Sequence, residues 1–405
     1  MYINRNRTQL KRVLIVNKFY YRRGGDCTYM LNLERMLQDR GHDTAVFAMQ
    51  YPENIASSWS GYFPKEVSFK GGFGNKLKAL GRILGMDDVK SRFKRLLEDF
   101  KPDVVHLNNI HSYLSPVIAG MAKEYGAKVV WTLHDYKLIC PSYSCLNGGE
   151  VCEACFSDPK AVVSRRCMKG SLAASAVAYV EARRWNRDLL EKNVDAFICP
   201  SRFMADKMAQ CGFDKSKLHV VHNFIPEKTP ASIEYAVRGD YYCYVGRLSP
   251  EKGVDTLLRA ASGIPQKLLV AGGGPMFEDL KERYRDVHHI VFLGKLSGES
   301  VAELLRQARF SVVPSEWYEN NPFSIIESLC AGTPVLGADI GGIPELIDSG
   351  NGLLYPHGDA DTLTEKIVAM DGMSADGAFD YSGIRGRALE KFAAETHYRA
   401  LLKIY

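Results

Sequence analysis

The chain has 405 residues, of which 46% are hydrophobic and 24% are charged, and its formal net charge is +5. These fractions are those of a globular protein, so they exclude a disordered or fibrous chain, and the length suffices for two domains with separate cores. The small positive excess, with no dense basic stripe among aromatic residues, gives no reason to expect nucleic-acid binding.

The first half of the chain alternates short apolar runs with helical patterns. We expect buried strands at residues 13–16, 44–49, 103–107, 128–133 and 195–199, and a helix at residues 28–40 that ends at Gly41. Strands that alternate with helices in this way form a parallel sheet with helices on both faces. The first half therefore predicts one doubly wound α/β domain.

The same alternation restarts after a polar segment at residues 227–240, which we interpret as an interdomain linker. Further strands are expected at residues 241–245, 267–271, 290–293, 310–313 and 334–337, with helices at 254–261 and 299–307. The chain is therefore predicted to form two Rossmann-like domains, at residues 1–225 and 226–381.

A candidate anion site lies at the start of a predicted helix near residue 322. Pro322 suits the first helical position, and Asn321 suits the capping position before it. The free N–H groups of Phe323 and Ser324 would then point toward a bound diphosphate.

Two glutamates flank this helix start. Glu327 lies one turn into the helix, where its carboxylate could accept both hydroxyls of a ribose, and Glu319 lies before the helix, on the side of a transferred sugar. The turn at residues 245–253 adds two cations, Arg247 and Lys252, which could converge on one diphosphate. Each feature alone would also fit a solvated surface, so the prediction depends on their combination.

Three glycines, Gly272, Gly273 and Gly274, directly follow the strand at 267–271 and permit close approach of the backbone to a base or phosphate. They do not form a dinucleotide fingerprint, because Phe277 stands where the last glycine of that motif is required. A nicotinamide oxidoreductase is therefore disfavoured.

Taken together, the Arg247/Lys252 turn and the Glu319/Glu327 spacing resemble the retaining glycosyltransferases of family 4, over nearly the whole chain. The resemblance implies the GT-B fold, an α/β architecture of two doubly wound Rossmann-like domains facing a central cleft. It also implies that Arg247 and Lys252 bind the donor phosphates. Glu327 would bind the ribose, and Glu319 would contact the sugar.

The family's N-terminal glycine loop matches Gly24 and Gly25, and its histidine near the transferred sugar looks like His134. Where the family often has a glycine-rich run between the glutamates, this chain has asparagines and proline at residues 320–322. The resemblance further implies that the C-terminal helix, at residues 382–405, packs back on the N-terminal domain.

The chemistry implied is hexosyl transfer from a nucleotide-diphosphate sugar with retention. We expect no cofactor for catalysis, because Arg247, Lys252 and the helix N-terminus at Phe323 can stabilise the leaving diphosphate without a metal ion. Two alternatives stay open: a nucleotide-sugar epimerase of the same architecture, and an inactive sugar-binding scaffold.

A cysteine-rich insertion at residues 140–167 follows His134. Four of its cysteines have a spacing that suits a structural zinc ion, namely Cys145, Cys152, Cys155 and Cys167. The alternative is a set of buried cysteines without metal, and a redox role is disfavoured because no thioredoxin-like strand precedes the Cys-x-x-Cys.

Residues 75–97 are basic and amphipathic. They fit either a solvated helix face over an ordinary core contact or a surface that docks on anionic lipid headgroups. With no run of about 20 apolar residues and no visible signal segment, we expect a cytoplasmic protein that acts at the inner membrane face. Its acceptor would be a glycan or a lipid-linked molecule used to build cell-surface polysaccharide.

Overall fold

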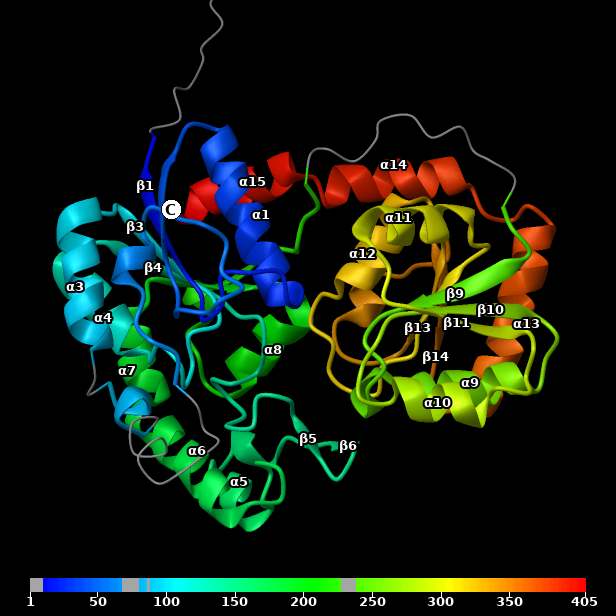
Figure 1. Ribbon diagram of the computed structural model, residues 1–405, viewed down its shortest axis with the longest axis horizontal. Coiled ribbons are helices and arrows are strands. Elements are labelled where there is room, and N and C mark those ends of the chain that lie inside the picture. The colour runs from blue at the N-terminus through cyan, green and yellow to red at the C-terminus, as the bar shows by residue number, and fades with distance from the viewer. Residues whose placement is uncertain (1–9, 68–79, 86–87, 227–237) are drawn as a thin grey trace, which may run out of the picture.

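The computed structural model of the chain describes residues 10–67, 80–85, 88–226 and 238–405 (Figure 1). The described residues contain two six-stranded sheets, in which every strand pair is parallel, and one short two-stranded hairpin. The two large sheets form the cores of two lobes that lie side by side, each with helices on both faces of its sheet (Figure 1). The predicted α/β fold class is confirmed.

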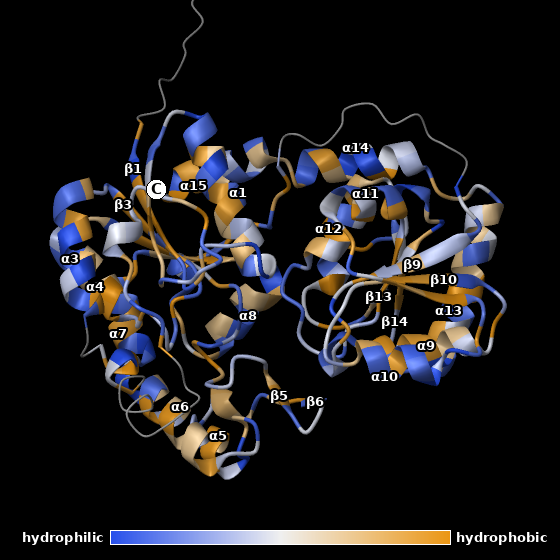
Figure 2. Cartoon of the chain, in the orientation of Figure 1, coloured by the Kyte–Doolittle hydropathy of each residue, from blue (hydrophilic) through white to orange (hydrophobic). Residues whose placement is uncertain are grey.

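The N-terminal sheet has the strand order β2-β1-β3-β4-β7-β8. Its strands are β1 (Arg12–Val16), β2 (Asp43–Phe47), β3 (Val104–Leu107), β4 (Lys128–Thr132), β7 (Ala196–Cys199) and β8 (Leu218–Val220). The main helices are α1 (Gly25–Asp39), α3 (Val89–Phe100), α4 (Val117–Tyr125), α6 (Leu172–Arg184), α7 (Arg187–Asn193) and α8 (Arg202–Gln210). The central strands are buried on both faces, which is why they read as continuous apolar runs (Figure 2).

The C-terminal sheet has the strand order β11-β10-β9-β12-β13-β14. Its strands are β9 (Tyr241–Val245), β10 (Lys267–Ala271), β11 (Ile290–Gly294), β12 (Ser311–Val313), β13 (Val335–Ala338) and β14 (Gly352–Tyr355). Its helices include α9 (Val254–Ser262), α10 (Phe277–Arg283), α11 (Gly298–Gln307), α12 (Phe323–Cys330) and α13 (Ala360–Ala375).

Each sheet has one point at which the strand order reverses. In the N-terminal sheet this point lies between β1 and β3, and in the C-terminal sheet it lies between β9 and β12. Open parallel sheets bind ligands outside the carboxyl ends of their strands at such a point, because the adjoining loops diverge there and leave a crevice. The loops after β1, β3, β9 and β12 are therefore the expected site.

The C-terminal helix differs from the prediction. Residues 381–404 form two helices, α14 (Tyr381–Lys391) and α15 (Ala394–Ile404), separated at Phe392 and Ala393. The prediction of one returning helix was wrong because the chain turns where it crosses between lobes. There the Ile225 N–H donates to the Phe392 carbonyl at 3.0 Å, so the two interdomain segments run side by side. Helix α14 packs on α12, and α15 packs on α1.

Buried polar contacts fix α15 to the N-terminal lobe. Tyr405 Oη lies 2.5 Å from His106 Nδ1, and His397 Nε2 lies 3.1 Å from Tyr29 Oη. Burial lowers the pKa of His106 to about 3, so this histidine is neutral and forms hydrogen bonds without carrying a charge.

Two strands of the large sheets were not predicted, and neither was the short hairpin at residues 146–151. Strand β8 is a short edge strand of partly exposed residues, and β14 begins with Gly352, so neither reads as a buried apolar run. Most of the predicted linker, residues 227–237, lies outside the described residues, and the domain boundary at 226 stays a prediction. In the described part of the chain, no helix is long and apolar enough to cross a membrane.

Candidate active site

Lys252 and Glu319 form a largely buried ion pair at the carboxyl edge of the C-terminal sheet. Lys252 Nζ lies 2.6 Å from Glu319 Oε1, and the Ser315 hydroxyl donates to the same oxygen at 2.7 Å. The ammonium group also lies over the Trp317 ring, at 4.9 Å. Burial by itself raises the pKa of Glu319, but Lys252 and the hydrogen bonds hold it below its usual value. The carboxylate is therefore ionised at neutral pH.

Arg247 lies in the same turn as Lys252, after β9, and it is exposed. The Tyr244 hydroxyl donates to the Arg247 carbonyl at 2.8 Å, which fixes the backbone of the turn. Because β9 pairs directly with β12, this turn lies next to the loop that carries Glu319. The structure thus brings three predicted donor-site residues to one edge of one sheet.

Helix α12 begins one residue later than predicted. Pro322 precedes the first turn, with φ −67° and ψ 126°, and contributes no side-chain cap. The prediction that Asn321 caps the helix was wrong, because its side-chain oxygen accepts the Asn223 N–H at 2.8 Å from the other lobe. The N–H groups of Phe323 and Ser324 lie in the first turn, where a helix supplies no acceptors of its own, so they are suited to an anion.

The glycine loop after β1 meets the start of α12. A Cβ placed at Gly25 would lie 3.5 Å from the Phe323 ring, so the first turns of α1 and α12 approach one another where the two lobes meet. Gly24 is the N-cap residue of α1, with φ −158°, which is ordinary extended backbone that does not require glycine. The predicted glycine loop of the N-terminal lobe and the predicted anion site at the start of α12 therefore face each other at this contact.

Glu327 differs from Glu319 in its surroundings. It is exposed, and in the part of the chain that the structure describes its carboxylate has no hydrogen-bond or ion-pair partner. The neighbouring protein displaces water that would solvate the charge, which raises the pKa of Glu327 to about 7. The carboxylate is thus available to accept hydrogen bonds from a ligand.

His134 lies two residues beyond the end of β4. Its Nε2 lies 2.9 Å from Asn108 Oδ1, and its ring packs edge-on against Tyr29 with centroids 4.9 Å apart. Burial lowers the pKa of His134 to about 4, and the charges of Asp26 and Asp135 only partly oppose this. The imidazole is therefore neutral at pH 7. Since Nε2 donates to Asn108, Nδ1 remains as an acceptor for a hydroxyl group.

Two of the three glycines after β10 are required by packing. A Cβ at Gly272 would lie 1.8 Å from the Gly246 carbonyl oxygen, and one at Gly274 would lie 2.3 Å from the Leu248 carbonyl oxygen. Gly273 faces Lys295, whose side chain would lie 3.0 Å from a Cβ at that position. Lys295 was missed in the sequence, although it directly follows a strand as the residues of the Arg247 turn do.

Gly341 and Gly342 also were missed. A Cβ at Gly341 would lie 2.5 Å from the Glu319 carbonyl oxygen, and the Gly342 N–H donates to that oxygen at 2.7 Å. These glycines are separated by two residues from the end of the buried strand β13 at Ala338, a signal similar to the one that singled out the glycines after β10. They let the backbone approach the loop of Glu319 closely enough to hold it.

The asparagines at 320 and 321 bridge the two lobes. Asn320 Nδ2 donates to the Leu133 carbonyl at 2.8 Å, and Ser201 donates its hydroxyl to Asn320 Oδ1 at 2.7 Å. Asn223 Nδ2 donates to the Asn321 carbonyl at 2.7 Å. This provides a physical reason for the departure from the glycine-rich run, because glycine could not make the contacts of the Asn320 side chain or the bond from the Asn223 N–H to Asn321 Oδ1.

The cysteines predicted to bind zinc lie close in the chain but make separate contacts. The insertion contains the hairpin β5 (Leu146–Asn147) and β6 (Glu150–Val151), then η2 (Ala154–Phe156) and α5 (Ala161–Ser164). Cys152 accepts from Arg165 at 3.2 Å, and Cys167 accepts from Asn147 at 3.5 Å. Among the described residues, no three His, Cys, Asp or Glu side chains are grouped to hold a metal ion. Zinc binding by Cys145, Cys152, Cys155 and Cys167 stays a prediction.

The described part of the basic segment at 75–97 buries its apolar face. Helix α3 packs five side chains into the core: Val89, Phe93, Leu96, Leu97 and Phe100. Arg82, expected on a solvated face, is buried and donates to the Tyr113 carbonyl at 2.9 Å. The apolar stripe of α3 is therefore not free to enter a bilayer. Residues 75–79 and 86–87 lie outside the described residues.

Two family models match the chain in succession. The model described as Glycosyltransferase Family 4 matches residues 23–228, which is about half of the chain. The model described as Glycosyl transferases group 1 matches residues 227–370. Between them they cover residues 23–370, which is most of both lobes.

Relatives and solved structures agree with these matches. A phosphatidyl-myo-inositol mannosyltransferase of Mycobacterium leprae is 24% identical over 86% of this chain and 83% of its own length. An uncharacterised 42.6 kDa protein in the cps region of Klebsiella pneumoniae is 26% identical over 82% of this chain and 87% of its own length. Anabaena Alr3699/HepE in complex with UDP-glucose has a TM-score of 0.65 and 17% identity, with 97% and 99% of the two chains covered. Sucrose-phosphate synthase from Thermosynechococcus elongatus has a TM-score of 0.69 and 18% identity, with 98% and 100% covered.

Proposed function

Because the chain belongs to Glycosyltransferase Family 4 and has the GT-B fold, we propose that it transfers a hexosyl group from a nucleotide-diphosphate sugar with retention at the anomeric carbon. One observation carries this proposal. The Lys252–Glu319 pair, the start of α12 and the Gly25 loop come together where the strand order of each sheet reverses. The family makes the protein a glycosyltransferase, which removes the epimerase alternative.

The donor diphosphate would bind between the Arg247 turn and the start of α12. Arg247 and Lys252 supply positive charge, and the N–H groups of Phe323 and Ser324 supply donors at the positive end of the helix dipole. Lys252 is already paired with Glu319, so the arriving phosphate shares an ammonium group whose position is fixed in advance. Anabaena Alr3699/HepE, named above for its UDP-glucose complex, supports a nucleotide sugar as the donor.

The two glutamates would then have separate roles. Glu327, which has an unpaired carboxylate at the exposed face of α12, would accept the hydroxyls of the ribose. Glu319, held by Lys252, would contact the transferred sugar. The neutral imidazole of His134 would accept a hydrogen bond from a sugar hydroxyl through Nδ1. A positively charged role for His134 is disfavoured by its low pKa.

The reaction we propose takes place on one face of the sugar. The bond from the anomeric carbon to the diphosphate oxygen breaks, and the acceptor hydroxyl forms the new bond from the same side. The proton of that hydroxyl passes to the departing diphosphate oxygen. Arg247, Lys252 and the start of α12 stabilise the charge that develops on the diphosphate, so the scheme uses no metal ion.

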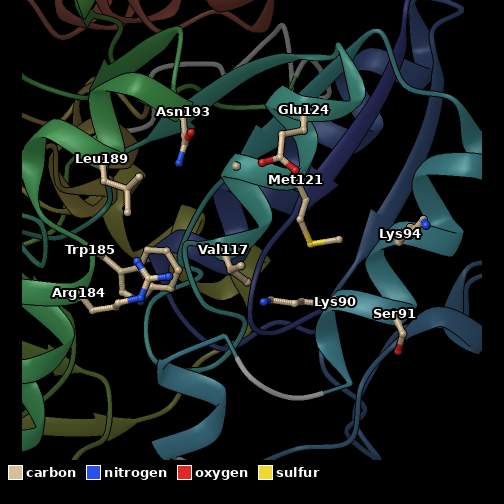
Figure 3. Close-up of a pocket in the computed structure, with 11 residues that line it drawn as sticks. Lys90, Ser91, Lys94, Val117, Met121, Glu124, Arg184, Trp185, Leu189 and Asn193 are labelled. Carbon is tan, nitrogen blue, oxygen red and sulfur yellow. The ribbon is translucent and has the colours of Figure 1, made fainter.

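We also propose a lipid-linked or cell-surface glycan acceptor, met at the inner membrane face. Relatives named as a phosphatidyl-myo-inositol mannosyltransferase, a protein in the cps region and an O-antigen biosynthesis glycosyltransferase support this choice. A pocket of about 530 Å³ between helices α3, α4 and α7 of the N-terminal lobe also supports it (Figure 3). Lys90, Lys94 and Arg184 line this pocket against one acid, Glu124, and Arg184 lies over the Trp185 ring at 4.3 Å.

Vesicle sedimentation tests the membrane contact. We expect the protein to sediment with anionic vesicles more than with neutral ones, and the variant Lys90→Glu/Arg184→Glu to lose this preference. The variant Lys160→Glu/Lys215→Glu, at two exposed lysines of the same lobe, controls for the same change in net charge. Equal sedimentation with both kinds of vesicle would contradict this part of the proposal.

Nucleotide binding tests the donor site. We expect one of UDP, GDP, ADP and CMP to raise the melting temperature, since a ligand at about 100 times its Kd adds roughly 2.7 kcal/mol of stability. At the same nucleotide concentration Arg247→Ala should reduce the stabilisation to about 0.4–1.4 kcal/mol. Lys267→Ala, at an exposed lysine of the same lobe, should keep the full shift. Transfer to any acceptor would then separate an enzyme from a scaffold. A protein that binds none of the nucleotides would favour the scaffold.

A further inference from the structure

The cysteine-rich insertion contacts the loop that carries Glu319. Its hairpin β5–β6 extends from the N-terminal lobe toward the C-terminal lobe (Figure 1). Just after this hairpin, Glu153 stands between Cys152 and Cys155. The hydroxyl of Tyr318, the residue directly before Glu319, donates to Glu153 Oε1 at 2.7 Å. A side chain of the insertion is thus bonded to the neighbour of a donor-site residue.

The contact is held from other sides as well. Lys207 of α8 lies 2.5 Å from the same Glu153 oxygen, and its ammonium group lies 5.4 Å from the centre of the Tyr318 ring. The rings of Tyr318 and Phe203 pack edge-on with centroids 4.7 Å apart. Burial raises the pKa of Glu153, but Lys207 and Tyr318 hold it below its usual value. The acceptor of the Tyr318 hydroxyl is therefore a carboxylate at neutral pH, and such hydrogen bonds are stronger than neutral ones.

Glu319 lies between two anchors to the N-terminal lobe. On one side is the bond from Tyr318 to Glu153, and on the other are the bonds of Asn320 to Leu133 and Ser201. Since the Glu319 side chain is fixed to Lys252 within the C-terminal lobe, the two anchors determine how that carboxylate sits relative to the opposite wall of the cleft.

We propose that Glu153 is a positioning residue for transfer. By accepting a hydrogen bond from the Tyr318 hydroxyl, the insertion fixes the position of the Glu319 loop relative to the N-terminal lobe. The proposal rests on the proposed function. The nucleotide would bind mainly to the C-terminal lobe, so loss of this bond should leave nucleotide affinity nearly unchanged. Turnover should fall, because transfer needs groups from both lobes at fixed relative positions. A displacement of about 1 Å can lower the rate about 100-fold.

The most direct test is Tyr318→Phe, which keeps the ring contacts and removes only the hydroxyl. Tyr241→Phe is the matched control, because the Tyr241 hydroxyl donates to the Leu304 carbonyl at 3.0 Å within the C-terminal lobe. Turnover is measured without added acceptor, as hydrolysis in which water takes the sugar and nucleoside diphosphate is released. The donor is whichever of UDP-glucose, GDP-mannose and ADP-glucose the wild type uses fastest. We expect kcat to fall about tenfold in Tyr318→Phe, with the Kd of the matching nucleoside diphosphate within twofold of wild type.

Glu153→Gln extends the test to the insertion. If the two side chains act through one bond, Tyr318→Phe should cost little more in the Glu153→Gln background than Glu153→Gln costs alone. Equal kcat in Tyr318→Phe and Tyr241→Phe, or fully independent losses in the double variant, would overturn the inference. Wild-type protein that binds no nucleotide and releases none from any of the three sugars would instead overturn the proposed function.

Discussion

Removal of Lys252 should leave a buried carboxylate without its counter-charge. Glu319 is 6% exposed, and its charge is balanced at 2.6 Å by an ammonium group that no other described residue replaces. In Lys252→Met the Ser315 hydroxyl would still donate to Glu319, but one neutral donor does not compensate a buried negative charge. We therefore expect that replacing Lys252 lowers the stability of the fold, although the main role proposed for this residue is in donor binding.

The size and the pH dependence of this loss follow from the same pair. Removing one partner of a buried ion pair lowers the free energy of unfolding by about 3 kcal/mol at the lower end of the observed range. We take the lower end because the Lys252 side chain is 26% exposed. For a domain of 150–250 residues this corresponds to roughly 6–12 °C in Tm. In the wild type the pKa of Glu319 lies below its ordinary 4.5, so its contribution is present above pH 4.5 and lost below it. In Lys252→Met burial raises the pKa of Glu319 above 4.5. The variant therefore loses stability as pH rises from 4.5 to that raised pKa, because the folded state then holds a proton that the unfolded state has released.

Denaturant unfolding at pH 5 and pH 8 measures the effect. We expect Lys252→Met to be destabilised more at pH 8 than at pH 5, and Lys252→Met/Glu319→Gln to recover most of the loss because no charge is then buried. Lys267→Met removes an exposed pair with Asp240 in the same lobe and should change stability by less than about 0.5 kcal/mol. A loss that is equal at both pH values, or that persists in the double variant, would refute the reasoning.

Other parts of the structure give further expectations. Arg247→Ala should raise the nucleotide Kd roughly 10- to 100-fold by calorimetry without lowering Tm, because the side chain is exposed and a hydrogen bond to a charged group contributes about 1.5–3 kcal/mol. Donor affinity should rise as pH increases through about 7, where Glu327 ionises and becomes a better acceptor, and a titration of Glu327→Gln should show no such rise. Glu345→Gln should cost about 1 kcal/mol in denaturant unfolding, because its carboxylate caps α8 of the other lobe. Tyr405→Phe should cost about 1–2 kcal/mol by the same assay, since it leaves buried His106 Nδ1 without its partner.

Local pattern was sufficient for most of the fold and for the position of the candidate site in the chain. Strands such as β1 and β9 are continuous apolar runs because they are buried on both faces, so the sequence alone indicates them. Turn and cap residues next to strand ends, such as Arg247 and the glycines after β10, follow from the same local signals. Local pattern failed at edge strand β8, which is too short and too exposed to differ from a loop.

Only the tertiary structure determined which side chains meet. Lys252 and Glu319 are 67 positions apart, and Tyr318 and Glu153 are 165 apart. Asn321 has the chemistry of a helix cap, yet it bonds to Asn223 of the other lobe instead. Helix and strand patterns depend on periodicity over a few neighbouring residues, so a short stretch of sequence is enough to predict them. The partner of a buried charge depends on how whole sheets and lobes pack, and that information is spread over the entire chain.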